Sequence, residues 1–123
     1  MKHFDRAEFA CKCGKCGLGL DDIDAIALGK LLSARARAGV PFVLNSAMRC
    51  ERHNKKIGGS HTSSHLNGCA FDIACQDSVP RFKILGALLA ADFKRIGIAK
   101  TFIHVDDDRG KPAGVAWIYE EEL

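Results

Sequence analysis

Two short apolar runs of this chain each contain a titratable residue near the middle. Asp72 lies within residues 69–74, and His104 lies within residues 102–106. Runs of this length and composition are typical of buried strands. A carboxylate or an imidazole in such a strand costs stability unless it is paired or binds a metal. We therefore expect Asp72 and His104 to belong to one polar site.

A second histidine, His65, precedes Asp72 by seven positions, at the end of a serine-rich segment. Two imidazoles and one carboxylate can bind Zn²⁺ and leave a fourth position open for water, and an open position distinguishes a catalytic zinc from a structural one. We predict that His65, Asp72 and His104 bind zinc. His61 lies four positions before His65, but nearby glycines and hydroxyl residues oppose a shared helix. We expect His61 at the rim of the site.

The segment from Ser63 to Asp72 reads Ser-x-His-x-x-Gly-x-Ala-x-Asp. This pattern resembles the signature of the M15-type zinc D,D-peptidases, which share a fold with hedgehog signalling domains. Residues 45–59 are similar to the Arg-Cys, His-Asn and Gly-Gly segment of that family, and residues 3–11 are similar to the opening of its small phage-type members. The resemblance implies a peptidase with His65, Asp72 and His104 as zinc ligands and a substrate that contains D-amino acids.

Three further residues are candidates for roles in catalysis. The resemblance implies that Arg49 binds substrate or stabilises the developing oxyanion, and that Ser63 helps to hold the substrate. Many relatives carry an acid three residues before the last zinc histidine, where this chain has Thr101. Asp106 shares a strand face with His104, because residues two apart in a strand point to the same side. Asp106 is therefore either the general base for the attacking water or a carboxylate that orients His104, and the sequence leaves both open.

Hydrophobic periodicity predicts two helices and four strands. The expected helices are residues 23–38, capped by Asp21 or Asp22, and a helix capped by Ser78 that extends to Gly97; the expected strands are residues 42–44, 68–74, 101–106 and 115–119, with the last two as a hairpin. Residues 50–68 are expected to form a long functional loop. Helices on a small antiparallel sheet give an α+β fold, and the resemblance implies the hedgehog/D,D-peptidase type. We expect Trp117 and Tyr119 in the core rather than in a wall of the cleft, and Asp107 and Asp108 in a solvated turn.

Composition restricts the possible partners and locations. The 123 residues fit one domain, residues 1–123, and we expect a monomer. The net charge is +3, and the basic residues are scattered among acidic ones, which predicts no nucleic-acid partner. No apolar run approaches membrane-spanning length, and the polar N-terminus lacks a signal core. We therefore predict a protein that is made in the cytoplasm, does not bind membranes, and acts on the cell wall only if it is delivered there.

The chain has six cysteines, of which Cys11, Cys13 and Cys16 are clustered. Three clustered thiolates suggest a structural metal, but a tetrahedral site needs a fourth ligand. That ligand could come from His3, Cys50 or Cys75 only if the fold brings one of them close. We expect free thiols in an N-terminal loop, and the sequence leaves a second metal open.

These features favour a zinc metallopeptidase that cleaves bacterial peptidoglycan stem peptides, of either the D-alanyl-D-alanine carboxypeptidase or the L-alanyl-D-glutamate endopeptidase type. The compact chain and its phage-type opening favour a phage or prophage lysis enzyme. The alternative is a non-catalytic, zinc-containing module that binds the cell wall, and Thr101 is the main argument for it. A zinc-dependent amidase that acts on another small peptide in the cytoplasm is a third, weaker hypothesis. The bond cleaved, the host and the delivery route stay open.

Overall fold

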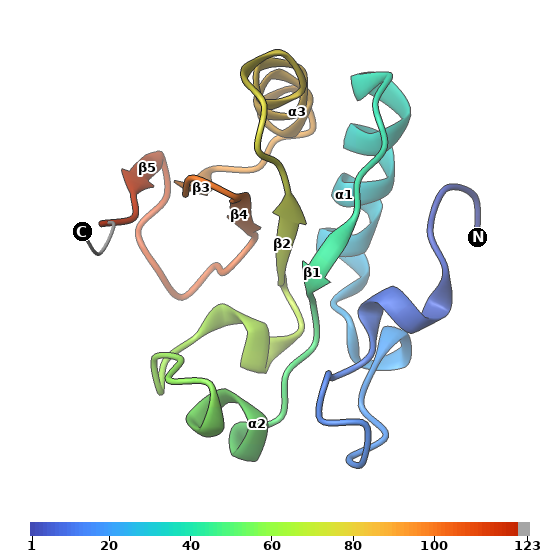
Figure 1. Cartoon of the computed structure of the whole chain (residues 1–123), viewed down its shortest axis with the longest axis vertical. Coiled ribbons are helices and arrows are strands. Elements are labelled where there is room, and N and C mark those ends of the chain that lie inside the picture. Colours follow the sequence, from blue (N-terminus) through green and yellow to red (C-terminus); the bar gives the residue numbers. More distant parts are fainter. Residues whose placement is uncertain (121–123) are drawn as a thin grey trace.

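A computed structural model describes residues 1–120 of the chain. Five strands form one sheet in the order β1-β2-β4-β3-β5 (Figure 1). Their bounds are β1 Leu44–Ser46, β2 Ala70–Ala74, β3 Arg95–Ile98, β4 Phe102–Asp106 and β5 Val115–Ile118. Neighbouring strands are antiparallel except β3 and β5, which are parallel. A sheet flanked by helices confirms the predicted α+β class.

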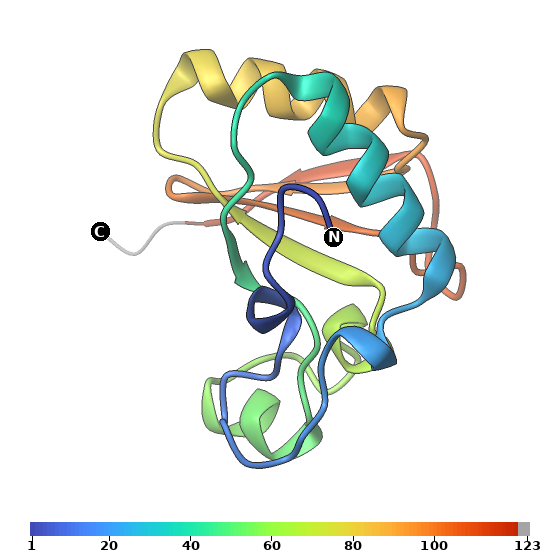
Figure 2. The same cartoon turned by 90° about the vertical axis from the view of Figure 1, so that its right-hand side faces the viewer.

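Two long helices, α1 (Ala25–Ala38) and α3 (Ser78–Ala90), pack beside each other on one side of the sheet (Figures 1 and 2). Helix α1 ends as predicted at Gly39, which adopts a left-handed φ of 70°. Its N-terminal cap differs from the prediction: the carboxylate of Asp24 accepts the N–H of Ala27 at 2.9 Å. The aspartates expected to cap α1 belong instead to a short 3-10 helix, η2 (Leu20–Asp22).

Helix α3 is shorter than predicted, and it buries a different face. It ends at Ala90 instead of near Gly97, and Asp92 follows with a left-handed φ of 72°. The apolar period at residues 82, 85, 89, 93 and 96 predicts the face that this helix turns to the core. Phe82 and Leu89, however, are 80% and 62% exposed. The buried side of α3 consists of Ile84, Ala87 and Leu88. The apolar residues at 93 and 96 fall beyond the helix, so the predicted helical face combined positions from a helix, a turn and strand β3.

Strand β3 also changes the predicted hairpin. Strands β3 and β4 form the hairpin, with Ile98 opposite Ile103, and β5 lies on the far side of β3. The predicted pairing of the last two strands is therefore wrong. Strand β1 begins two residues later than expected. The segment 50–68 is not one loop, because it contains helix α2 (Glu51–Lys56) and a 3-10 turn, η3 (Ser64–Asn67).

The two faces of the sheet differ in chemistry because side chains alternate along each strand. The face under the helices is apolar and holds the fully buried side chains of Phe71, Ile73, Ile103 and Val105. On the opposite face, one register row crosses four strands as Asp72, His104, Gly97 and Trp117. The apolar face and the helices thus form the core, and the other face is left to carry polar groups.

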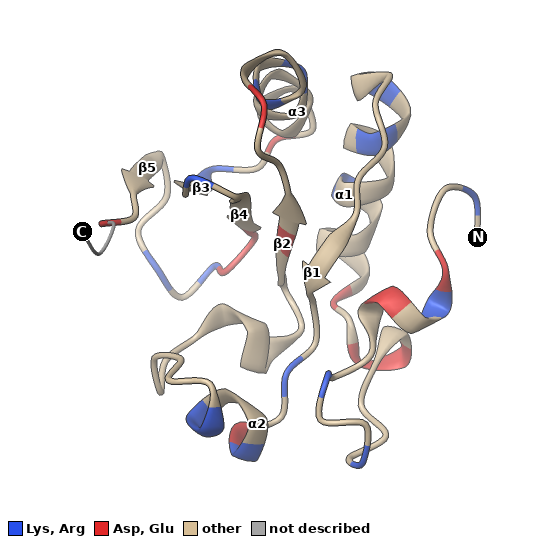
Figure 3. Ribbon diagram, in the orientation of Figure 1, with Lys and Arg blue, Asp and Glu red and all other residues tan. Residues whose placement is uncertain are grey.

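Charged residues are distributed over the whole fold. Lys and Arg lie on α1, α2, β3 and several loops, with Asp and Glu among them (Figure 3). Within residues 1–120, no helix is both long enough and apolar enough to cross a membrane. A single domain over residues 1–123 stays a prediction, and its last three residues lie outside the described part of the chain.

Candidate active site

Asp72 and His104 meet as directly opposed residues of the antiparallel pair β2 and β4. His104 Nδ1 lies 2.9 Å from Asp72 Oδ1. Because the residues flanking each of them point into the core, both side chains are held on the open face of the sheet. The structure therefore brings together the two titratable residues that the sequence placed in separate apolar strands.

His65 reaches the same place from η3, the turn that precedes β2. The hydroxyl of Ser63 caps this turn by accepting the N–H of His65 at 3.2 Å. His65 Nδ1 lies 2.7 Å from the carbonyl oxygen of Ala47, so the Nδ1 position carries the proton and donates it to that carbonyl. The other ring nitrogen, Nε2, faces Asp72 and lies 3.2 Å from its Oδ2.

The three residues present a donor set that fits a zinc ion. One ligand atom from each of His65, Asp72 and His104 lies within 4.8 Å of the other two. Both histidines are buried, so little solvent competes for their nitrogens. Two imidazole nitrogens and one carboxylate oxygen match the donors of catalytic zinc sites that keep an open position. His61 is exposed and does not line this cleft in the described structure.

Asp106 holds His104 from the side opposite Asp72. Asp106 Oδ2 accepts a hydrogen bond from His104 Nε2 at 2.8 Å. Its Oδ1 accepts from Arg95 Nε at 2.8 Å and from the backbone N–H of Asp108 at 3.1 Å. The Asp106 side chain is only 1% exposed. Both carboxylate oxygens are therefore occupied, and the contact directs His104 Nδ1 toward Asp72 and His65.

Arg49 lies beside the donor set, at the end of the segment that follows β1. Its guanidinium donates to Asn54 Oδ1 at 2.8 Å and to Ser46 Oγ at 3.1 Å, and it lies 3.8 Å from Asp72 Oδ2. These contacts hold the planar group at the wall of the cleft. Burial lowers the pKa of Arg49, while the charge of Asp72 opposes that effect.

The cleft above these groups has a volume of about 420 Å³. Trp117 and Tyr119 form part of its lining, so the expectation that they pack in the core is wrong. The Trp117 ring centroid lies 5.6 Å from that of His104. Gly97 allows this approach, since a Cβ atom at that position would lie 2.5 Å from Trp117 Nε1. The absence of a side chain at Gly97 thus allows the Trp117 ring to pack close to His104.

The other rim of the cleft is a hydrogen-bonded cluster around Lys111. Lys111 Nζ donates to the carbonyl of Thr62 at 2.6 Å and to Ser64 Oγ at 2.9 Å. Ser64 in turn donates to Asp108 Oδ2 at 2.7 Å. Asp108 is thus not a solvated turn residue as expected.

Asp107 also differs from the expectation of a solvated turn residue. Its carboxylate forms an ion pair of 2.7 Å with Lys30 of α1, and its side chain is only 11% exposed. The turn after β4 is therefore attached to α1 through Asp107 and to the rim of the cleft through Asp108.

Charges in the site stabilise one another strongly in the metal-free protein. Burial opposes ionisation of Asp72, but hydrogen bonds from His104 and His65 outweigh it and hold the pKa of Asp72 below its ordinary value. Burial also disfavours a charged His104, yet contacts with Asp106 and Asp72 raise the pKa of His104. The pKa of Asp106 is lowered, because the hydrogen bond from His104 outweighs its burial. Carboxylates on both sides of one imidazole thus favour a protonated His104 when no metal is bound.

Two residues of the site were missed by sequence reasoning, Arg95 and Lys111. Arg95 contacts Asp106 and lies over the Trp117 ring at 5.1 Å, but its segment was assigned to a helix. The one local signal against a helix was Asp92, which lies in the segment of residues 91–94 that separates α3 from β3. Lys111 lies in a turn whose path depends on the position of β5, so no local pattern identifies it.

Comparison with known proteins assigns the chain to a family. A family model described as Peptidase M15 matches residues 2–106, a range that contains the three metal-ligand candidates and Asp106. No individual curated protein matches the chain significantly. The matched range covers most of the chain, from the N-terminal segment to the end of β4, and the members of the family are metal-dependent peptidases. The chain therefore belongs to the peptidase M15 family.

Proposed function

We propose that this chain is a zinc metallopeptidase that hydrolyses peptide bonds in the stem peptides of bacterial peptidoglycan. One observation carries the proposal: His65, Asp72 and His104 place their ligand atoms within 4.8 Å of one another, in a cleft that Arg49 also lines. Nitrogen and carboxylate donors suit zinc better than they suit magnesium or calcium, which favour all-oxygen sites. When bound, zinc polarises the scissile carbonyl and makes water a stronger nucleophile.

The chain's own residues fix the ligands in place. The carbonyl of Ala47 holds the proton of His65 on Nδ1, which leaves Nε2 as the ligand nitrogen. We infer that Asp106 does the same for His104, accepting from Nε2 so that Nδ1 is presented to the metal. Carboxylates and carbonyls in these positions usually set the tautomer and the orientation of metal-bound histidines. This supports the orienting role for Asp106 over the role of general base.

The charges of the cleft support an anionic peptide as substrate. Three cationic side chains line it, those of Arg49, Arg95 and Lys111. Arg95 is already paired with Asp106, whereas Arg49 holds its longest contact, 3.8 Å, with the carboxylate of Asp72. A metal bound to Asp72 would reduce that attraction and leave the guanidinium available for a substrate carboxylate. Stem peptides carry such carboxylates on D-glutamate and at their C-termini. We propose that Arg49 binds one of them and that Ser63, at the same cleft, helps to position the peptide.

The alternative is a zinc-containing module that binds the cell wall without cleaving it. Among the described residues that line the cleft, only Asp72 and Asp106 carry carboxylates, and both oxygens of Asp106 are hydrogen-bonded. With Thr101 at the position where many relatives have an acid, the described part of the cleft offers no free carboxylate as a base. This observation favours the binding module, whereas the family assignment and the predicted open metal position favour turnover.

A direct assay separates the two. The zinc-loaded protein is incubated with purified muropeptides, and the products are identified by mass. Loss of a terminal D-alanine indicates a carboxypeptidase, and release of a peptide beginning with D-glutamate indicates an endopeptidase. His104→Ala is the negative control, and His61→Ala is the matched histidine control. Intact muropeptides that nevertheless bind the zinc form would establish the binding module and refute the proposal.

The biological setting is a further proposal. Cleavage of stem peptides would suit a phage or prophage lysis enzyme that is made in the cytoplasm and delivered to the wall. The test is expression of the chain together with a membrane-permeabilising partner in a bacterial host. Lysis that requires both proteins and an intact His104 supports the proposal, and lysis that is equal with His104→Ala contradicts it.

A further inference from the structure

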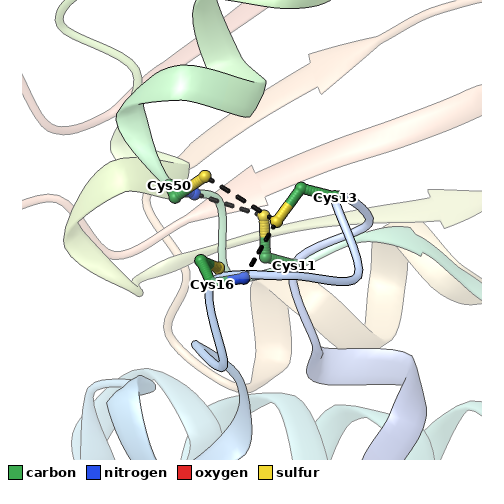
Figure 4. Close-up of side chains that lie close together, drawn as sticks. All are labelled: Cys11, Cys13, Cys16 and Cys50. Carbon is green, nitrogen blue, oxygen red and sulfur yellow. Dashed lines mark hydrogen bonds between the residues drawn. The ribbon is translucent and has the colours of Figure 1, made fainter.

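A second group of potential ligands lies outside the cleft. Cys50, at the start of α2, lies against the N-terminal segment that carries Cys11, Cys13 and Cys16 (Figure 4). One sulfur from each of the four cysteines lies within 4.8 Å of the other three. His3 and Cys75, the other candidates for a fourth ligand, do not belong to this group as described. The fold thus supplies, in Cys50, the fourth thiol that the sequence alone could not identify.

The sulfur positions match the size of a tetrahedral metal site. Cys13 Sγ and Cys50 Sγ lie 4.0 Å apart. Four sulfurs at about 2.3 Å from a tetrahedral Zn²⁺ are separated from one another by about 3.8 Å. All six cysteines of the chain are free, so the four sulfurs are not joined in disulfides. A metal can therefore enter this group with small shifts of the side chains.

The backbone around the cluster is arranged to stabilise thiolates. Each of the four sulfurs accepts at least one backbone N–H. Cys13 Sγ accepts from the amides of Lys15 and Cys16, both at 3.3 Å. Cys11 Sγ accepts from Cys50, Cys16 Sγ from Leu18, and Cys50 Sγ from His53, each at 3.4 Å. Amides that converge on sulfur compensate negative charge, which suits thiolate ligands better than neutral thiols.

Two glycines produce this arrangement. Gly14 and Gly17 adopt left-handed φ angles of 70° and 78°, which other residues rarely adopt. They turn the chain tightly after Cys13 and after Cys16, so that the following amides point back at the sulfurs. A Cβ atom at either glycine would meet no neighbour within 4 Å, so packing does not require glycine there. The turn itself, and with it the thiol cluster, accounts for both residues.

We propose that Cys11, Cys13, Cys16 and Cys50 bind a structural zinc ion, separate from the metal of the cleft. Four soft thiolates select zinc over magnesium or calcium, and four protein ligands leave no open position for chemistry. The site joins the N-terminal segment to Cys50, the residue directly after Arg49. It therefore fixes the start of α2 and, through it, the backbone that carries Arg49 to the cleft.

Metal analysis of the purified, reduced protein tests the proposal. Wild type should contain two zinc ions per chain, Cys16→Ser one, His104→Ala one, and the double variant none. Cys16 is the best position to change because it is exposed and its loss leaves no cavity. Cys75→Ala, which lies outside the cluster, should keep both ions. A wild-type content of one ion that is lost in His104→Ala, or an unchanged content in Cys16→Ser, would overturn the second site.

Cobalt substitution gives an answer that does not depend on any variant folding. Co²⁺ in a site of four thiolates shows sulfur-to-metal charge-transfer absorption, which a site of two histidines and one aspartate does not produce. We expect this absorption in wild type and in His104→Ala, and its loss in Cys16→Ser. Cobalt-loaded wild type without that absorption would refute thiolate ligation. Intact-mass measurement showing two disulfides in the freshly purified protein would refute it as well.

Discussion

His104 is held between two carboxylates, with Asp72 2.9 Å from its Nδ1 and Asp106 2.8 Å from its Nε2. The two contacts are not equivalent, because Asp72 also lies 3.2 Å from His65 whereas Asp106 is bound to Arg95. A metal held by Asp72, His65 and His104 would thus use His104 Nδ1, while His104 Nε2 would keep its proton and donate it to Asp106. The two aspartates, on neighbouring strands, therefore have different roles: Asp72 is the candidate metal ligand, and Asp106 orients His104.

Asp106→Asn tests the orienting role. The amide has one acceptor oxygen, so it cannot accept from His104 and from Arg95 on separate oxygens. We expect zinc affinity to fall roughly 10–100-fold, the range for loss of a group that orients a ligand. Turnover measured at saturating zinc should stay near wild type. A loss of turnover of about 10²–10⁴-fold with unchanged zinc affinity would instead identify Asp106 as the general base.

Removal of a single ligand tests the metal site in the cleft. His65→Ala, Asp72→Ala and His104→Ala should each abolish zinc binding in the cleft, because two remaining donors hold zinc poorly. Metal content and peptidase activity are measured together. His61→Ala is the matched control, since His61 is an exposed histidine four residues from His65 and should keep both properties. Full occupancy in His104→Ala would contradict the site as described.

The polar residues of the strands could be predicted from sequence because they stand out locally. Asp72 and His104 each interrupt an apolar run, and alternation along a strand puts His104 and Asp106 on one face. The C-terminal end of α1 could also be predicted, because Gly39 follows a regular apolar period. In these cases the signal lies within a few residues of the feature that it predicts.

The predictions that were wrong concern features that depend on contacts between distant segments. Leu89 and Phe93 are separated by one helical turn, yet Leu89 is exposed and Phe93 is buried beyond the end of α3. The parallel pairing of β3 with β5 is set by topology and not by a turn motif. Cys50 is far from Cys16 along the chain, so spacing could not reveal that their sulfurs converge.

Arg49→Lys separates substrate binding from metal binding. Lysine keeps the charge but loses the planar group that contacts Asn54 and Ser46. Loss of a charged hydrogen bond to substrate costs about 1.5–3 kcal/mol, which corresponds to roughly 10–150-fold in kcat/KM. Zinc content should not change. Arg52→Lys, on the exposed side of α2, is the matched control and should be neutral. Equal kcat/KM for the Arg49 variant and wild type would exclude a substrate role.

Zinc binding in the cleft should depend on pH through His104. Its raised pKa means that, in the metal-free protein, the imidazolium form stabilises the fold below the ordinary pKa of 6.5, and this contribution is lost as pH rises through the raised pKa. Zinc must displace the Nδ1 proton, so its affinity should increase with pH until that raised pKa is passed. Calorimetry in buffers of different ionisation enthalpy should show proton release on zinc binding that diminishes as pH rises through that raised pKa. Proton release that is unaffected by Asp106→Asn would argue against this coupling.

Gly97→Ala tests whether the aromatic wall of the cleft matters. The new Cβ would lie 2.5 Å from Trp117 Nε1 and 2.7 Å from the Tyr119 ring, so both rings must shift away from residue 97. We expect a loss of about 1–3 kcal/mol in the free energy of unfolding from overpacking, and weaker substrate binding. Trp117 is the only tryptophan, so its fluorescence reports the displacement directly. Gly86→Ala in α3 is the control: its Cβ meets nothing within 4 Å, and alanine should stabilise the helix by about 0.5–1 kcal/mol. A Gly97→Ala protein with wild-type fluorescence, stability and KM would show that the approach of Trp117 to His104 has no functional consequence.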